Sequence, residues 1–239
     1  MTRTFSNEIL SLNRRLKILF LFFLLLAFHP PAPSQSAASD RDQVLDVLGK
    51  MKNHFKELED YSCEVEQIYF QNGEELRRIF FTYCFRKDGQ VRIDFSYPQT
   101  GTTLFYRKGE PKATILPIRS LRGLKFRFSV QSPFLKTLTG QQIDQTDMGY
   151  FIDFLDRSLV ETVQPGFDFR EEKNEVAFVI VARDYIEGKT LEKYRITLSR
   201  NIWLPLRIER YSLENIPIEK SLLRHYVLNA RPGDAFFLP

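Results

Sequence analysis

Two pairs of acidic residues are the first positions in this chain whose type and spacing could do chemistry. Neighbouring carboxylates can serve as general acid and general base, and Glu64 with Glu66 and Asp153 with Asp156 have that spacing. The first pair alternates with the inward positions of an expected strand, and the second lies off the apolar stripe of an expected helix. Ordinary solvated faces therefore explain both pairs, and we expect no catalytic residue among them.

Histidine and cysteine offer no stronger chemistry. Beyond residue 38 the chain has two histidines, His54 and His225, which fit a helix boundary and a strand end. The sequence contains no His-Glu-x-x-His pair, no Cys/His cluster with metal spacing, no Gly-x-Ser-x-Gly turn and no glycine-rich phosphate loop. We therefore predict a protein that is not an enzyme and uses no metal and no cofactor.

The two cysteines, Cys63 and Cys84, lie on segments that alternate like strands and meet at Asn72-Gly73, a strong hairpin signal. With those two residues as the turn, Cys63 faces Thr82 and Cys84 lies diagonally to it. With a four-residue turn the cysteines are directly opposite. Either register puts them on one face within bridging range. A disulfide is the prediction for an oxidising compartment, and two buried free thiols are the alternative.

The N-terminal residues predict export. A basic stretch at residues 14–17 precedes an apolar run from Ile18 to Phe28, and prolines and small residues follow as far as Ala38. This order is typical of a secretory signal peptide, and the run is shorter than the about 20 residues of a membrane span. No cysteine follows that would carry a lipid anchor. We predict a signal peptide over residues 1–38 and a soluble exported product, with an uncleaved anchor as the alternative.

Charge and size limit what the exported part can be. Removing residues 1–38 takes away Arg3, Arg14, Arg15, Lys17 and Glu8, so the net charge falls from +4 to +1. A nucleic-acid surface needs a clustered basic excess, which is missing, so we expect no nucleic-acid partner. Residues 39–239 suit one domain, and their many phenylalanines must be hidden in a core or around an apolar ligand.

Helical and strand patterns alternate in blocks along the chain. Residues 40–58 and 147–160 each carry one apolar stripe with helical spacing. Alternation typical of strands covers 61–71, 75–86, 91–97, 102–108, 112–118 and 123–130, and then 167–172, 175–183, 191–199, 203–212 and 218–228. This order without βαβ units predicts an α+β fold, a curved antiparallel sheet with its helices on one face. The space under the helices is either a packed core or an apolar cavity.

Three stretches resemble the LolA/LolB-like superfamily of periplasmic lipoprotein carriers. They are DYSCEVEQIYFQNGEELRRIFFTYCFRKDGQVRIDFSYPQTGTTLFYRKGE at 60–110, LTGQQIDQTDMGYFIDFLDRSL at 138–159 and ITLSRNIWLPLRIERYSLENIPIEKSLLRHYVLNARPGDAFFLP at 196–239. The middle stretch is similar to an uncharacterised exported branch of LolA-like proteins. The resemblance implies an unclosed β-barrel of about eleven strands with helices as a lid, in a single periplasmic domain over residues 39–239.

The resemblance also implies a function and a site. In the carriers the cavity holds the acyl chains of lipoproteins, and an arginine in a basic turn bonds to the lid. By that likeness we expect a monomeric, non-catalytic carrier or binding protein for a lipid or lipoprotein acyl chain, with envelope proteins as further partners. Arg86 is the expected lid-contacting cation, and a loop-end cation in water is the alternative. An envelope protein–protein interaction module without a ligand cavity is the alternative function.

The helices are expected to form the lid and to exchange contacts within their stripes for contacts with the ligand. The residues expected to bind it come from both stripes and from one strand: Val44, Leu48, Met51, Phe55, Met148, Phe151, Ile152, Leu155, Phe126 and Phe128.

Overall fold

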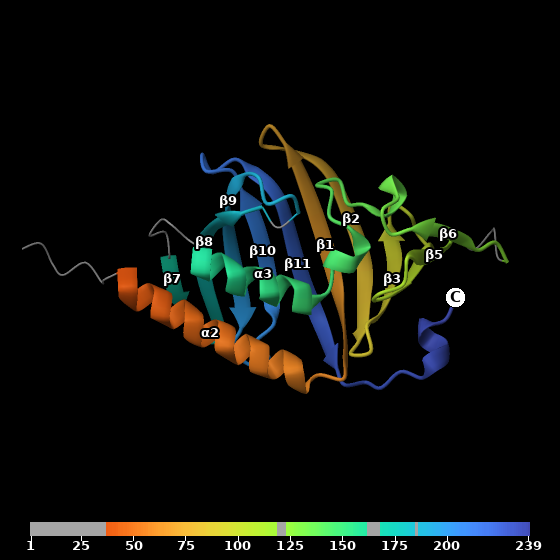
Figure 1. The fold of residues 1–239 in the computed structure, drawn as a ribbon, viewed down its shortest axis with the longest axis horizontal. Helices are drawn as coiled ribbons and strands as arrows, with labels where there is room; N and C mark the ends of the chain where they lie inside the picture. Colours follow the sequence, from red (N-terminus) through yellow and green to blue (C-terminus); the bar gives the residue numbers. More distant parts are fainter. Residues whose placement is uncertain (1–36, 119–122, 162–167, 185) are drawn as a thin grey trace, which may run out of the picture. The chain divides into compact units, whose positions relative to one another are not determined.

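Eleven strands form one antiparallel sheet in the computed structural model, which describes residues 37–118, 123–161, 168–184 and 186–239 (Figure 1). The strands lie in the order β6-β5-β4-β3-β2-β1-β11-β10-β9-β8-β7. Their bounds are β1 Asp60–Gln71, β2 Glu74–Arg86, β3 Gln90–Tyr97, β4 Thr103–Arg107, β5 Lys112–Leu116, β6 Phe126–Ser129, β7 Asp168–Glu171, β8 Glu175–Arg183, β9 Leu191–Ser199, β10 Pro205–Tyr211 and β11 Pro217–Leu228. The expected signal peptide lies outside the described residues except for Ala37 and Ala38.

The first and the last strand pair at the middle of the sheet. β1 runs antiparallel to β11, with Val65 opposite Leu223 and Tyr69 opposite Glu219. The strands that follow β1 extend the sheet in one direction, and those that precede β11 extend it in the other. β6 and β7 are therefore the two edges of the sheet, and the barrel is unclosed, as the resemblance implied.

Two α-helices, α2 (Ala37–Glu57) and α3 (Met148–Glu161), lie across one face of this sheet (Figure 1). Their apolar stripes are buried against it, and the ring of Phe154 on α3 lies 5.0 Å from that of Tyr194 on β9. An ion pair of 2.6 Å between Lys52 and Asp156 links the two helices. The predicted α+β arrangement is thus confirmed. Among the helices that the structure describes, none has the length and apolar character needed to cross a membrane.

Residues 130–147, here called the connecting segment, join β6 to α3. They contain two short 3₁₀ helices, η2 (Pro133–Leu135) and η3 (Ile143–Gln145). Thr139 fixes the middle of the segment by donating a 2.8 Å hydrogen bond to Glu219 on β11. Lys108 fixes its end through a 3.2 Å contact with Asp147. The segment is therefore tied to the sheet on the helix-bearing side.

The hairpin of β1 and β2 corrects the prediction for the cysteines. The turn is Asn72-Gly73, but a bulge beside it shifts the register by one residue. Cys63 therefore faces Tyr83, and Cys84 faces Ser62. Because neighbouring strand residues point to opposite faces, the two cysteines lie on opposite sides of the sheet. The prediction that they share a face is wrong, and both are buried free thiols here.

A second correction concerns Arg86. Its guanidinium bonds to Asp234 at 2.7 Å and lies 5.0 Å from the ring centre of Phe237, both in the C-terminal 3₁₀ helix η4 (Asp234–Phe237). The neighbouring Lys87 instead makes the helix contact that was expected of Arg86. Its Nζ donates to the backbone oxygen of Lys56, near the end of α2, at 2.9 Å. A shift of one position along the strand end separates the two roles, because the side chains alternate between faces.

Candidate ligand cavity

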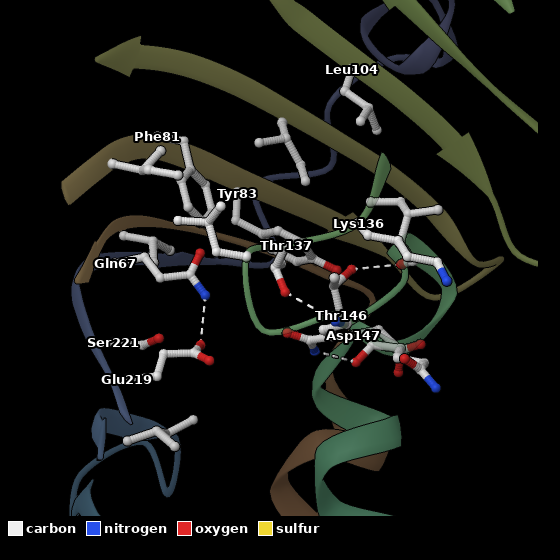
Figure 2. A pocket seen from close by; sticks show the side chains of 18 of the residues that line it. Gln67, Phe81, Tyr83, Leu104, Lys136, Thr137, Thr146, Asp147, Glu219 and Ser221 are labelled. Carbon is white, nitrogen blue, oxygen red and sulfur yellow. Dashed lines mark hydrogen bonds between the residues drawn. The ribbon is translucent and has the colours of Figure 1, made fainter. Parts of the chain in front are cut away.

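A cavity of about 290 Å³ lies on the helix-bearing face of the sheet (Figure 2). Aromatic and aliphatic side chains of the sheet form much of its wall, among them Val65, Ile79, Phe81, Tyr83, Leu104 and Leu223. The connecting segment and the first turn of α3 supply the facing wall, among them Leu135, Ile143, Met148 and Phe151. Pockets for small ligands span about 300–1,000 Å³, so this cavity suits one narrow apolar group.

Strand register explains why these side chains meet. On β1 the odd-numbered residues from Tyr61 to Tyr69 line the cavity, since alternate residues share a face. Val65 is opposite Phe81 on β2 and Leu223 on β11, which places three apolar side chains in one row across the sheet. The sequence alternation that predicted the strands therefore also builds the wall.

A polar row crosses the sheet at the hairpin end of the cavity. Cross-strand pairs join Arg77 on β2 to Tyr69 on β1, Tyr69 to Glu219 on β11, Glu219 to Arg210 on β10, and Arg210 to Tyr194 on β9. Three members of this row, Tyr69, Glu219 and Arg210, are among the cavity-lining residues that are almost fully buried. The sheet side of the cavity therefore carries its charged side chains at one end.

Arg210 is the centre of a buried ionic network in that row. It is 4% exposed and lies 2.8 Å from Glu219 and 3.0 Å from Glu192. Glu219 also accepts a hydrogen bond of 2.7 Å from Gln67 (Figure 2). A second one, of 2.8 Å, comes from Thr139. Buried charges are tolerated only when they are paired and hydrogen-bonded, and this network meets that condition.

Phenol groups add hydroxyls to the wall without adding charge. Burial raises the pKa of Tyr61, Tyr69 and Tyr83 well above the ordinary phenol value, because the phenolate would lose its hydration. All three side chains are therefore neutral at physiological pH. On β1 and β2 these phenols therefore add polarity to the wall without charge.

Seven of the ten residues expected to bind a ligand fall into two groups in the structure. Met148 and Phe151, near the start of α3, line the cavity. Five others are packed in the closed core between the helices and the sheet, with 0–3% exposure: Val44, Leu48, Met51, Ile152 and Leu155. The helical stripes are thus mainly core, and only the first turn of α3 reaches the cavity.

The remaining three expected residues lie elsewhere. Phe55 packs against the edge of the core and lies 6.0 Å, ring centre to ring centre, from Phe85. Phe126 and Phe128 are on the edge strand β6, and Phe128 lies 5.5 Å from Phe134 of η2. Phe134 does line the cavity, so β6 touches the site through this neighbour rather than directly.

Sequence reasoning missed the connecting segment and the polar row. The segment has no periodic pattern that would place it over the sheet. The row did leave a signal, because Arg210 continues the inward alternation of Ile208 on β10, and Glu219 continues that of Ser221 on β11. Charged residues at inward positions of a strand indicate a buried network or a polar end of a cavity.

The free thiols allow a first prediction. Burial raises the pKa of Cys63 to about 12 and that of Cys84 to about 11, from an ordinary value of 9.0. Native protein at pH 8 should therefore react with Ellman's reagent far more slowly than protein in guanidinium, which should release two thiols per chain. Fewer than two thiols after unfolding would reveal a disulfide and contradict the structure.

The raised pKa values of the two thiols also make the stability of the folded protein depend on pH. Both folded-state pKa values are raised, so the stabilising effect of the neutral thiols is complete below pH 9 and is lost as the pH rises through 11 and 12.

Among the described residues, no group of three or more His, Cys, Asp and Glu side chains is placed to hold a metal ion.

The comparisons with known proteins concern only the arrangement of helices and strands. No protein-family model and no curated protein sequence matches the chain. A LolA superfamily protein from Nitrosomonas europaea is 11% identical, with 82% of this chain and 97% of that chain covered and a TM-score of 0.39. The Mycobacterium tuberculosis lipoprotein LppX is 8% identical, with 79% and 98% covered and a TM-score of 0.44. The Pseudomonas aeruginosa MucA/MucB complex contains a chain that is 14% identical, with 81% and 61% covered and a TM-score of 0.37.

At these identities and TM-scores the matches carry no argument about what this chain binds. The strand order and the placement of the helices are observed directly in this structure. An unclosed sheet of eleven antiparallel strands, with α2 and α3 across one face, makes the fold of the described part of this chain α+β.

Proposed function

We propose that this chain is an exported, non-catalytic carrier or binding protein for an apolar ligand such as a lipid or the acyl chain of a lipoprotein. The cavity is the observation that carries this proposal. Where α2 and α3 cover the sheet, the core is closed, and Leu155 is 0% exposed. Beside that core, apolar walls enclose about 290 Å³ under the connecting segment. A core that is filled on one side and hollow on the other fits a binding role.

Burial of a hydrocarbon chain would drive binding. Each methylene group removed from water contributes about 0.8 kcal/mol, so about ten of them give roughly 8 kcal/mol of gross driving force. Immobilising the chain and opening the cover offset part of this gain. The moving part in this proposal is the connecting segment with the first turn of α3, since the stripes of both helices are already buried in the core.

The proposed compartment is the periplasm, reached through a signal peptide over residues 1–38, with residues 39–239 acting as a monomer. The sequence pattern supports this assignment: a basic region, an apolar run of sub-membrane length and a small-residue site in that order. A carrier exported in this way would receive and deliver its ligand within the cell envelope.

Uptake of a fluorescent fatty acid tests the proposal. Delipidated protein should bind the probe saturably, and Phe151→Asp should abolish binding, because a carboxylate on the apolar wall would have to be desolvated. Phe80→Asp is the matched control: Phe80 is half-buried like Phe151 but lies on the face of β2 opposite to Phe81. Thermal unfolding of both variants separates loss of binding from loss of fold.

Two results would contradict the carrier. One is that the wild-type protein takes up no probe, and the other is that Phe151→Asp takes it up as well as Phe80→Asp. Mass spectrometry of an organic extract from purified protein gives an independent reading, since a carrier should retain lipid.

A protein-binding role is the second candidate, and exposed apolar side chains beside the cavity favour it. Phe134 and Leu138 of the connecting segment are 79% and 51% exposed. Large exposed apolar side chains at one place are typical of interaction surfaces. An envelope protein that inserts one apolar side chain into the cavity would use the same walls, and absence of both retained lipid and probe uptake would support it.

A further inference from the structure

The charged side chains of the polar row at the hairpin end of the cavity have ionic partners, except at its β2 end. Glu219 is matched by Arg210, Gln67 and Thr139, and Arg210 lies between two carboxylates. Arg77 closes the row on β2, lines the cavity and is exposed. Within the described part of the chain, Arg77 makes neither an ion pair nor a side-chain hydrogen bond. An exposed cation thus lies at the cavity without an ion-pair partner among the described residues.

The other charges around the cavity do not cancel Arg77. Asp147 is 6% exposed, contacts Lys108 at 3.2 Å and accepts a 2.9 Å hydrogen bond from the backbone N–H of Tyr150. Lys136 of the connecting segment is a second exposed lining cation, and among the described residues it has no acidic partner. The exposed charged side chains among the described lining residues, Arg77 and Lys136, are therefore both positive.

Arg77 is placed to hold one end of a ligand whose remainder is apolar. It shares a face with Tyr69, its cross-strand partner, while Ile79 and Phe81 follow it on the cavity side of β2. From Tyr69 to Cys63 the cavity side of β1 extends over six residues, or about 20 Å at 3.3 Å per residue. Along the cavity side of β2 the side chains thus change from the charged Arg77 to the apolar Ile79 and Phe81.

We propose that the cavity takes an amphiphile with a single hydrocarbon chain and an anionic head, a carboxylate or a phosphate, which Arg77 binds. This inference rests on the proposed function and names its ligand class. A planar guanidinium can bind either head through two parallel hydrogen bonds, whereas the ammonium of Lys136 is a point charge on a long flexible stem. The volume of about 290 Å³ allows one chain, so lipids with two acyl chains do not fit entirely.

Titration calorimetry with three ligands of equal chain length tests this assignment. Dodecanoate and dodecyl phosphate carry the anionic head, and dodecan-1-ol is the neutral control. Purified, delipidated protein should bind the anionic ligands at least about tenfold more tightly than the alcohol, the effect of one charge-assisted hydrogen bond. Whichever anion binds more tightly identifies the head group, and either order supports the inference.

Variants locate the head group. Arg77→Gln should weaken binding of the tighter anion about tenfold and leave dodecan-1-ol unchanged. Arg78→Gln is the matched control, since Arg78 is the next residue on β2, points to the other face and bonds to Glu66 and Glu75. It should change neither affinity. Lys136→Gln should cost less than Arg77→Gln.

Each contrary result has one meaning. Equal affinity for the anions and the alcohol overturns the anionic ligand class but leaves the carrier standing. Unchanged anion binding by Arg77→Gln, or a larger loss with Lys136→Gln, overturns the assignment to Arg77. Failure of all three ligands to bind the wild-type protein counts against the carrier itself.

Discussion

Arg210→Met is expected to lower the free energy of unfolding by about 3–5 kcal/mol, the usual cost of leaving buried charges without their partner. The substitution would keep the aliphatic stem but would leave Glu192 and Glu219, which are 7% and 4% exposed, without their shared cation. Urea unfolding monitored by circular dichroism gives the free energy. The matched control is Arg195→Met, whose exposed side chain is 4.0 Å from Glu209 and should cost less than about 1 kcal/mol.

A triple variant shows whether charge is the cause. Combining Arg210→Met with Glu192→Gln and Glu219→Gln removes both buried carboxylates, so this variant should be more stable than Arg210→Met alone. If the triple variant is the less stable one, the loss arises from packing and hydrogen bonding rather than from unpaired charge. Equal losses for Arg210→Met and Arg195→Met would show that the network does not stabilise the fold.

Leu155→Ala is expected to cost about 2–5 kcal/mol of unfolding free energy, the range for a leucine truncated in a closed core. Leu155 is 0% exposed on α3, one turn beyond Phe151, which lines the cavity. Uptake of the fluorescent fatty acid by the folded variant should match that of the wild-type protein. On the same helix, Leu155 is thus expected to affect stability, and Phe151 is expected to affect ligand binding.

Urea unfolding and probe titration of Leu155→Ala and Phe151→Asp, measured side by side, check this division. Loss of uptake in folded Leu155→Ala would mean that the ligand also contacts the space under the middle of α3. The helical stripe would then act as the moving lid that the sequence resemblance implied.

The sequence predicts the elements of this fold well, because their patterns are local. The alternation over β8 and β9 gives bounds identical to those in the structure, Glu175–Arg183 and Leu191–Ser199. The stripes of α2 and α3 predict which sides of these helices are buried. The pairing of β1 with β11 could not be predicted in this way, since periodicity states that a strand is buried on one face but not which strand lies beside it.

The site was harder to predict for the same reason. The apolar stripe of α3 has the same sequence pattern whether it faces the core or a cavity, so the pattern could not separate core residues from lining residues. Of the expected residues, only Met148 and Phe151 line the cavity. The one-residue bulge in the first hairpin, which separates Cys63 from Cys84, has no sequence signature beyond the turn itself. The connecting segment is positioned by single contacts, such as the hydrogen bond from Thr139 to Glu219, and no periodic sequence pattern predicts such contacts.

The central seam between β1 and β11 has a consequence for how the protein is made. Its strand pairs join residues far apart in the chain, such as Tyr61 on β1 and Leu228 on β11. Contacts of such separation form late and slowly, because a long loop must close first. A nascent chain therefore cannot complete this sheet until its last strand, β11, has been synthesised.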